Sequence, residues 1–480
     1  MAILTGRKKE LEELKRLYCS GKSELVAVYG RRRVGKTFLV DEAYKGLITF
    51  RHAGLSPVDE RGKANMLADQ LQHFYQSLIL QGMKKSHRPD FWLEAFFMLE
   101  QWLQQIDNGS RQVIFIDELP WLDTPRSKFL TAFESFWNSW ACHRDNVLVV
   151  VCGSATSWIK DKLINNHGGL YGRVTWEIKL SPFNLEESEQ FFKSRGVRLS
   201  RYDIAQCNMI LGGIPYYLQY IQSGMSLAQN IDKILFAHNA LLEQEYDRLF
   251  SSIFNNPEEM KRIIGLLAER RGGYTRKEIS EKLGTDNNGY LSTILNSLIA
   301  SDFIIKYIPF GTNGRNSHYK LIDPYCIFYH KFIKDKVQLN NEFWLSNIAS
   351  PKISSWRGYA FEELCLRHIG KIKSALGISG VSTSESAFVV KGNDDTEGSQ
   401  IDLIIERKDG IVNMCEMKFY NSDYTVTKAY ERKIVERYNL VTGLISKKSC
   451  VNPVLITTFG LDSNEYSSSF QNVITLDDLF

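Results

Sequence analysis

The chain has 480 residues and an ordinary globular composition, with 44% hydrophobic residues, 24% charged residues and a net charge of +4. Because single hydrophobic cores stop growing at about 250–300 residues, this length excludes a one-core protein and predicts three or four structural units. The composition also excludes a collagen-like or low-complexity protein, whereas the small net charge leaves the kind of partner open.

The chain begins with MAILTGRKKELEELKRL, which predicts a charged amphipathic helix rather than a signal peptide. No apolar stretch approaches the roughly 18 residues of a membrane-spanning helix. The eight cysteines are scattered, form no CxxC pair, and in several cases lie inside apolar segments. We therefore expect a reduced, cytoplasmic protein without a zinc site and without a membrane partner.

Residues 24–37, ELVAVYGRRRVGKT, predict a phosphate-binding loop between a buried strand and a helix, because they fit the pattern GxxxxGK[ST]. Glycine lets the backbone N–H groups wrap around phosphates. The lysine reaches the β- and γ-phosphates, and the threonine hydroxyl ligates Mg²⁺. The expected nucleotide-binding residues are Gly30, Arg31, Arg32, Arg33, Val34, Gly35, Lys36 and Thr37.

The second apolar strand, within VIFIDE, ends in Asp117 and Glu118. We expect Asp117 to hold Mg²⁺ through its water shell and Glu118 to act as the catalytic residue that polarises the attacking water. A third apolar strand runs into Ser154, which either senses the γ-phosphate or only turns the loop. Ligands of open parallel sheets bind at the strand ends, and this favours the sensing role.

Two further residues follow in chain order. Arg173, in LYGR, is either a catalytic arginine that stabilises charge on the phosphates or a surface residue in a salt bridge. The segment GGIP, which ends at Pro215, predicts a stiff turn between the helices of a small helical lid.

Five motifs in series resemble those of the archaeal-type P-loop ATPases of the AAA-like, STAND-related group: GRRRVGKT, VIFIDELPWL, LVVVCGSATSWI, LYGR and GGIP. The resemblance covers roughly the first half of the chain. It implies ATP rather than GTP, since the guanine-reading tetrapeptide NKxD is absent from the sequence. It also implies that Pro215 lies near the nucleotide and that residues 4–7 help to enclose the base.

Residues 253–345 predict a winged helix, with three helices followed by two strands around a turn-rich wing. A helix that reads the major groove usually presents Arg, Lys, Asn or Gln. The third helix offers polar side chains but no basic one: Asn287, Asn288, Ser292, Thr293 and Asn296. On or near the wing, Arg315, His318 and Lys320 suit phosphate contacts. Whether this unit binds DNA or packs against protein stays open.

Residues 399–420 predict a β-hairpin whose second strand contains CEMKFY. Strand side chains alternate, so Glu416 and Lys418 share a face, with Asp402 on the paired strand. Metal-dependent phosphodiester cleavage needs such a set, with Asp402 and Glu416 as Mg²⁺ ligands and Lys418 orienting or deprotonating the water. Glu362, on a helix upstream, could complete the metal shell. The alternative is a cross-strand charge pair in an ordinary sheet.

With the upstream helix GYAFEE, this set resembles the PD-(D/E)XK nuclease superfamily, in the variant found as a C-terminal domain on archaeal-type ATPases. The resemblance covers about residues 350–480 and implies a restriction-endonuclease-like fold. The sequence departs from the named pattern at one position, because Ile401 rather than proline precedes Asp402.

Together these patterns predict an α/β multidomain protein with four parts: a P-loop ATPase core whose parallel sheet is flanked by helices (1–183), a helical lid (184–252), a winged helix (253–345) and a restriction-endonuclease-like domain (350–480). The expected function is an ATP-hydrolysing switch that controls a Mg²⁺-dependent DNA nuclease-like domain. The alternative is a regulatory or signalling ATPase whose C-terminal domains bind DNA or protein without cutting. ATP, Mg²⁺ and DNA are the expected ligands, and homo-oligomer formation is left open.

Overall fold

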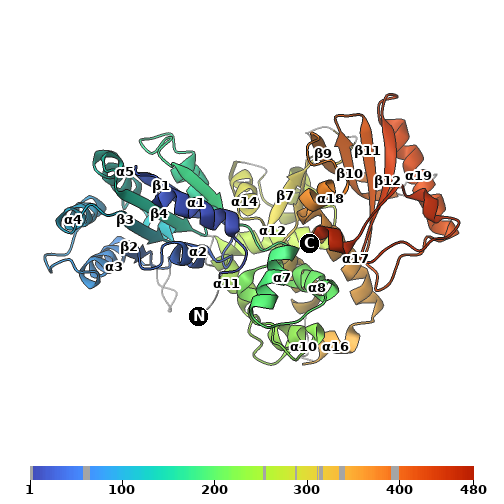
Figure 1. Ribbon diagram of the computed structural model, residues 1–480, viewed down its shortest axis with the longest axis horizontal. Helices are drawn as coiled ribbons and strands as arrows, with labels where there is room; N and C mark the ends of the chain where they lie inside the picture. Colours follow the sequence, from blue (N-terminus) through green and yellow to red (C-terminus); the bar gives the residue numbers. More distant parts are fainter. Residues whose placement is uncertain are drawn as a thin grey trace. The chain divides into compact units, whose positions relative to one another are not determined.

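The computed structural model describes residues 4–57, 65–251, 256–286, 289–310, 312, 317–334, 341–390 and 399–480 (Figure 1). The chain divides into two compact units. The first consists of Met1–Pro182, Asp247–Glu258 and Asn296–Ser301, and the second consists of Phe183–Tyr246, Glu259–Leu295 and Asp302–Phe480. Each unit is built around a five-stranded sheet, and the second unit carries a smaller sheet of three strands as well.

The sheet of the first unit is parallel, with strand order β2-β3-β4-β1-β5. Every residue of β1, β3 and β4 is buried, so these strands are almost continuously apolar. Such runs are typical of parallel strands with both faces covered. The strands are β1 (Glu24–Tyr29), β2 (Ile48–Ala53), β3 (Gln112–Asp117), β4 (Val147–Gly153) and β5 (Trp176–Lys179).

The first unit's helices surround this sheet (Figure 1). Aromatic side chains fill much of its core: the Phe96 ring lies 5.2–6.0 Å from the rings of Phe74, Trp92, Phe129, Phe133 and Phe136. The helices are α1 (Lys8–Tyr18), α2 (Lys36–Ala43), α3 (Leu67–Leu80), α4 (Trp92–Gln105), α5 (Phe129–Ser139), α6 (Thr156–Trp158), η1 (Leu119–Leu122), η2 (Ala141–His143) and η3 (Ile159–Ile164). The short α11 (Glu245–Ser251) lies where the chain returns to this unit.

The second unit opens with short helices. The turn predicted at GGIP lies between two of them: Gly212 ends α8 with φ 71°, and Pro215 is the first residue of α9. Gly213 is required there, since a Cβ at this position would lie 2.2 Å from the Phe183 carbonyl oxygen. The helices are α7 (Leu185–Ser194), α8 (Arg201–Leu211), α9 (Pro215–Leu218), α10 (Leu227–Ile231) and η4 (Asp232–Phe236).

Three helices and three short strands form the middle of the chain. Thr275 starts α13 with a capping box, because its hydroxyl accepts from the Glu278 N–H while the Glu278 carboxylate accepts from the Thr275 N–H. The antiparallel sheet has order β6-β8-β7. The elements are α12 (Pro257–Glu269), β6 (Tyr274–Thr275), α13 (Arg276–Leu283), α14 (Gly289–Ala300), β7 (Ile304–Tyr307) and β8 (His318–Leu321). The predicted residues Asn287, Asn288 and Arg315 lie outside the described residues.

The C-terminal part of the second unit has a mixed sheet of order β13-β12-β11-β10-β9. Strands β9, β10 and β11 pair antiparallel, whereas β11, β12 and β13 pair parallel. The predicted hairpin is confirmed, with β10 and β11 joined by a turn in which Gly410 has φ 89°. The strands are β9 (Thr383–Val390), β10 (Ser399–Arg407), β11 (Ile411–Lys418), β12 (Cys450–Thr457) and β13 (Asn472–Ile474).

Helix α17 packs against β11 and helix α19 against β12 (Figure 1). One core cluster joins α19 to the sheet through Ile434, Val441, Met414 and Leu455. The helices from the middle to the end of the unit are α15 (Pro324–Phe328), η6 (Tyr329–Ile333), α16 (Phe343–Asn347), α17 (Pro351–Arg367), α18 (Ile369–Ala375), α19 (Lys428–Leu444), η7 (Ser467–Ser469) and η8 (Leu476–Leu479). Among the described residues, no helix has the length and apolarity needed to span a membrane.

Candidate functional site

The phosphate-binding loop joins β1 to α2 with a sharply folded backbone. Gly30 has φ 145°, and a Cβ there would lie 2.2 Å from the Leu180 carbonyl oxygen, so only glycine fits. Gly35 has φ 93° and immediately precedes the first residue of α2. The loop therefore ends at a helix N-terminus, whose backbone N–H groups and positive dipole end favour phosphate.

Lys36 is buried, and its ammonium group has three oxygen partners. Its Nζ donates to the carbonyl oxygens of Gly30 and Arg31 and to Ser154 Oγ, each at 3.0 Å. Burial lowers the pKa of Lys36, and the nearby charge of Glu118 opposes that shift. These acceptors hold the positive charge at the loop, where the β- and γ-phosphates of a bound nucleotide lie in this motif.

Thr37 and Asp117 meet at the end of β3. The Thr37 hydroxyl donates to Asp117 Oδ2 at 2.7 Å. Burial raises the pKa of Asp117, while the hydrogen bond from Thr37 lowers it. A hydroxyl and a carboxylate oxygen side by side are the hard ligands that Mg²⁺ prefers, so the two residues fit the metal that the sequence predicts.

Ser154 lies between Lys36 and Glu118 because β4 lies between β1 and β3 in the sheet. Its hydroxyl donates to Glu118 Oε1 at 2.8 Å, and its N–H donates to Glu118 Oε2 at 3.1 Å. The Ser154 hydroxyl also accepts from Lys36. The structure thus brings together five residues that the sequence predicts for the ATP site: Lys36, Thr37, Asp117, Glu118 and Ser154.

The other predicted residues of the ATP site lie as follows. Arg31 and Val34 are buried in the loop, and the Arg32 guanidinium lies 5.9 Å from the Trp121 ring centre. Arg33 has φ 71°. Arg173 is exposed in the turn before β5, and its side chain makes none of the contacts described above for the loop.

Two predicted features stand apart from the loop contacts. Arg7, the last residue of the segment expected to enclose the base, is buried and donates through Nη2 to the Ser181 carbonyl oxygen at 2.5 Å. Pro215 belongs to the second compact unit, so its expected proximity to the nucleotide stays a prediction.

Glu416 is the centre of the second candidate site, in the C-terminal sheet. Its side chain is fully buried, and Oε2 accepts hydrogen bonds from the Tyr430 hydroxyl at 2.6 Å and from Arg437 Nη1 at 2.5 Å. The other oxygen, Oε1, has no hydrogen-bond partner among the described residues. Buried polar atoms are rarely left unpaired, so this oxygen marks a place where a ligand fits.

Asp402 lies beside Glu416 on the neighbouring strand. The β10–β11 pairing places Leu403 opposite Cys415, one step from this pair, and the Met417 N–H donates to Asp402 Oδ2 at 2.9 Å. A β-bulge between Ile401 and Ile404, where β10 pairs with β9, breaks the alternation of side chains; bulges commonly re-aim a side chain. Burial raises the pKa of Asp402, and the charge of Glu416 raises it further.

Lys418 completes the predicted set. Its Nζ lies 3.7 Å from Glu416 Oε2 and 5.0 Å from the centre of the Tyr430 ring, and the side chain is 24% exposed. The ammonium group therefore lies within the site rather than in free solvent. Asp402, Glu416 and Lys418 gather at one edge of the sheet, as the hairpin predicts.

Glu362 requires a correction. The described residues contain no group of three or more His, Cys, Asp or Glu side chains that could hold a metal, so Glu362, Asp402 and Glu416 do not form one set of ligands. The physical reason is that Glu416 is held toward α19 by Tyr430 and Arg437, whereas Glu362 lies on α17. Burial and the charge of Asp402 raise the pKa of Glu362 to about 8.

Lys320 was expected to offer a phosphate contact on the wing, and the structure overturns this expectation. Its side chain is largely buried and forms an ion pair with Glu363 of α17. Burying a lysine without a partner is costly, and the neighbouring carboxylate compensates for that cost. The positive charge of Lys320 is therefore paired with Glu363 within the second unit instead of facing a DNA phosphate.

Sequence reasoning missed Tyr430 and Arg437. Both lie on α19 and are seven residues apart, so they share one face of the helix. That spacing, on a helix directly after the Glu-x-Lys strand, was the available signal. The spacing identifies partners of Glu416 only in combination with the packing of α19 on the sheet.

Residues 4–221 match the family described as "ATPase domain predominantly from Archaea". An uncharacterized protein of Methanocaldococcus jannaschii is 24% identical over 450 residues, which cover 92% of each chain. An uncharacterized ATP-binding protein of the same organism is 48% identical over 40 residues, 8% of this chain and 68% of that protein. Among solved structures, a Walker-type ATPase of Pyrococcus abyssi is similar at TM-score 0.46 and 18% identity, over 68% of this chain and 96% of that one.

The family match and the loop geometry concern the same part of the chain. The matched residues include the loop from Gly30 to Thr37, the acidic end of β3 and Ser154 after β4. They extend into the second compact unit as far as the helix that begins at Pro215. Residues 4–221 therefore match the predominantly archaeal ATPase family and carry the loop geometry of a P-loop ATPase.

Proposed function

We propose that this ATPase hydrolyses ATP with Glu118 as the residue that polarises the attacking water, and that the cycle controls a nuclease-like site in the second unit. The observation that supports the first part is the set of contacts around Ser154, which connects the phosphate-binding Lys36 to Glu118. A phosphate that displaces Ser154 from Lys36 changes the surroundings of Glu118 in the same event. Arg173, which is exposed, would stabilise charge on the phosphates only after moving toward them.

Bound Mg²⁺ would be held by Thr37 and Asp117, and it would supply charge neutralisation on the phosphates. The remaining work falls to this chain's own residues. Lys36 compensates for the negative charge of the transferred phosphoryl group. Glu118 accepts a hydrogen bond from the water and orients it toward phosphorus.

Lys36→Ala and Glu118→Gln separate binding from hydrolysis. Lys36→Ala should lose ATP binding, because it removes the cation at the phosphates. Glu118→Gln should bind ATP as wild type does but hydrolyse it about 10²–10⁴-fold more slowly, since it keeps the shape and loses the basic carboxylate. Phosphate release and equilibrium binding of a fluorescent ATP analogue measure the two effects, and wild-type turnover in Glu118→Gln would refute the assignment.

For the second unit, we propose that Asp402 and Glu416 hold a divalent cation and that Lys418 takes part in cleaving DNA phosphodiesters. The supporting observation is the unpartnered, buried Glu416 Oε1 beside Asp402 and Lys418. Two carboxylates suffice, because Mg²⁺ usually keeps several waters and takes further oxygens from phosphate. Glu362 contributes as an electrostatic neighbour of Asp402 rather than as a ligand.

The proposed step is hydrolysis. The bound cation would polarise the phosphate. The Lys418 ammonium orients a water molecule and offsets the negative charge that develops on the phosphate. The water loses its proton to solvent, and the new oxygen–phosphorus bond forms as the bond to the leaving oxygen breaks. The leaving oxyanion takes a proton from solvent. Arg437 and Tyr430 position Glu416 through the hydrogen bonds already described.

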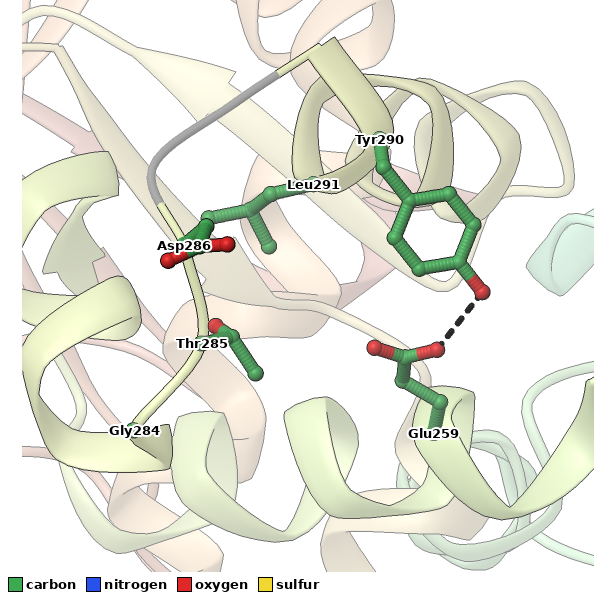
Figure 2. Close-up of a pocket in the computed structure, with 6 residues that line it drawn as sticks. All are labelled: Glu259, Gly284, Thr285, Asp286, Tyr290 and Leu291. Carbon is green, nitrogen blue, oxygen red and sulfur yellow. Dashed lines mark hydrogen bonds between the residues drawn. The ribbon is translucent and has the colours of Figure 1, made fainter.

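A regulatory ATPase that binds without cutting is the second candidate function, and one feature of the middle segment favours it. A cavity of about 320 Å³ lies at the start of α14, lined by Glu259, Gly284, Thr285, Asp286, Tyr290 and Leu291 (Figure 2). The Tyr290 hydroxyl donates to Glu259 Oε2 at 2.7 Å. Carboxylates on this face repel DNA phosphates, so a protein partner suits it better, although the helix and strand order of the segment supports a winged helix.

A plasmid-nicking assay decides between the two candidates. The wild-type protein should nick supercoiled DNA in Mg²⁺ but not in EDTA, and Lys418→Ala should reduce the rate by about 10²–10⁴-fold. Lys428→Ala, which removes an exposed lysine at the start of α19, is the matched control. The assay is repeated with ATP and in Lys36→Ala to test control by the first unit.

The outcomes separate clearly. Metal-dependent nicking that is lost in Lys418→Ala and kept in Lys428→Ala supports the nuclease proposal. Absence of nicking at every ATP concentration would leave the regulatory candidate. Equal nicking by wild type and Lys36→Ala, with and without ATP, would refute control by the ATPase.

A further inference from the structure

Three aromatic rings stack at the edge of the C-terminal sheet, next to Lys418. The Tyr202 ring lies 4.9 Å from the Phe419 ring with an interplanar angle of 15°, and 5.8 Å from the Phe459 ring with an angle of 20°. Phe361 of α17 packs on Phe419 at 5.3 Å. Phe459 is the solvent-exposed member of this stack, with 46% of its surface accessible.

A cavity of about 440 Å³ adjoins the stack. Its volume lies within the range of about 300–1,000 Å³ that is usual for small-molecule pockets. Its wall combines the aromatic rings of Tyr202 and Phe459 with side chains that donate and accept hydrogen bonds. The lining residues are Ser200, Arg201, Tyr202, Asn421, Asp423, Thr458, Phe459, Leu476 and Asp477.

The topology places this cavity at the same sheet edge as the proposed nuclease site. Strands β11 and β12 are parallel, and Lys418 pairs with Thr457, so the segments that follow both residues leave the sheet side by side. The Tyr420 N–H donates to Thr458 Oγ1 at 2.9 Å and ties those segments together. Asn421 and Phe459 are therefore fixed close to the strand end that carries Lys418.

The charges around the cavity exclude a phosphate and suit the edge of a base. Arg201 already forms ion pairs with Asp477 at 3.0 Å and with Glu189 at 3.2 Å. Asp423 adds a further carboxylate to the wall. Carboxylates repel the DNA backbone but accept hydrogen bonds from the exocyclic amino groups of bases. A side-chain amide such as that of Asn421 can both donate a hydrogen bond to a base and accept one from it.

We propose that this cavity binds one unpaired base of a single DNA strand, with the base stacked on Phe459 and its edge facing Asn421 and Asp423. The inference rests on the proposed function, because it takes a phosphate of the same strand to be held beside Lys418. Base–aromatic stacking contributes about 1–3 kcal/mol per base and tolerates any sequence. The site would therefore favour single-stranded or frayed DNA over intact duplex.

The experiment uses the full chain and a 12-nucleotide single strand that carries one 2-aminopurine, whose fluorescence is quenched by stacking. Calcium replaces magnesium in the buffer, since both ions prefer oxygen ligands and cutting is to be avoided. Wild type should quench the probe. Phe459→Ala should abolish the quenching and weaken binding about 5- to 150-fold, the fold-change that corresponds to the stacking energy. Phe459→Trp should restore both.

Controls keep the test specific. Phe97→Ala, which removes a phenylalanine that is 55% exposed on α4, should leave quenching and affinity unchanged. Asn421→Ala should keep the quenching but reduce discrimination among bases placed at the probed position. Blunt duplex DNA should bind wild type and Phe459→Ala equally.

Failure of this inference can be told from failure of the proposed function. If wild type cuts DNA but does not quench the probe, or if Phe459→Ala binds the single strand as tightly as wild type, the base-binding site is refuted and the nuclease proposal stands. If quenching depends on Phe459 while no cutting occurs, the base-binding site stands and the nuclease proposal falls.

Discussion

Gly30 and Glu118 adopt backbone conformations that most residues avoid, with φ of 145° and 45°. At Gly30 the reason is space, because the Leu180 carbonyl oxygen occupies the position of a side chain. At Glu118 the left-handed conformation turns the chain directly after β3, and both carboxylate oxygens meet Ser154. Glycine adopts its conformation without strain, whereas the left-handed conformation of Glu118 costs about 1–3 kcal/mol, and strained residues of this kind gather at functional sites. The ATP site therefore holds local backbone strain at Glu118.

Gly30→Ala should destabilise the protein by about 3 kcal/mol or more and weaken ATP binding, because the added Cβ cannot avoid a backbone oxygen. Gly46→Ala is the matched control: Gly46 also has positive φ, at 72°, but a Cβ there meets nothing within 4 Å. It should cost only about 1–2 kcal/mol, the penalty for a left-handed residue. Urea unfolding and ATP titration measure both variants, and equal losses would contradict the steric explanation.

At the scale of elements, His368 joins two helices of the second unit. It follows α17, where its Nδ1 donates to the Leu364 carbonyl oxygen at 2.8 Å. Its Nε2 accepts from the Leu185 N–H, at the first residue of α7, at 3.1 Å. The N–H groups of a helix's first turn lack partners within the helix, so this acceptor satisfies one of them only while the imidazole is neutral. Burial lowers the pKa of His368 to about 4.

This arrangement predicts acid sensitivity. The pKa of His368 is lower in the folded state than the about 6.5 of an unfolded chain, so the unfolded state binds the proton first and stability falls as pH drops from about 6.5 toward 4. The loss attributable to His368 should be about 2–3 kcal/mol at pH 4.5. Urea unfolding at pH 7 and pH 4.5 measures it, and His368→Gln should show a smaller difference. An unchanged pH dependence in this variant would contradict the role of His368.

The sequence predicted the elements whose residues are neighbours in the chain. It did not predict contacts between residues that only folding brings together. The phosphate loop spans eight consecutive residues, so its glycines and Lys36 were recognisable from spacing alone. The β10–β11 hairpin was equally local, and it correctly placed Asp402 beside Glu416. Tyr430 was beyond such reasoning, because its contact with Glu416 depends on how α19 packs on the sheet.

Burial and ion pairing explain why the predicted roles of Lys320 and Glu362 were wrong. Lys320 was expected to be exposed on the wing, but its ion pair with Glu363 depends on a helix about 40 residues further along the chain. Glu362 is predicted to complete the metal shell, but the described residues form no group of three metal ligands, and Arg271 and Lys320 act on its charge besides Asp402. Neither interaction leaves a local pattern in the sequence. Charged residues were therefore the hardest to place, since burial and partner choice decide their role.

At the scale of the whole molecule, the chain leaves the first compact unit at Pro182 and returns to it twice, at Asp247–Glu258 and at Asn296–Ser301. The returning segments bring fully buried side chains, including Leu249, Phe250 and Leu298. The first compact unit thus includes residues that lie beyond the end of the ATPase sequence motifs.

A fragment that ends at Pro182 should therefore be much less stable than the same unit in the full chain. Loss of large buried side chains typically costs about 2–5 kcal/mol each. The fragment should unfold at least about 10 °C lower, given roughly 2–4 °C per kcal/mol for a unit of this size. Circular dichroism melting compares the fragment with the full chain and with residues 1–301. A fragment 1–182 that melts with the full chain would show that the returning segments are dispensable.

The same path of the chain governs how the protein is made. A ribosome that has released Pro182 must add roughly 120 further residues before Ser301 emerges and the first unit has all of its parts. At about 5–20 residues per second, this interval lasts about 6–24 s. During that time the first unit lacks two of the segments that belong to it, and a chaperone has its best opportunity to bind.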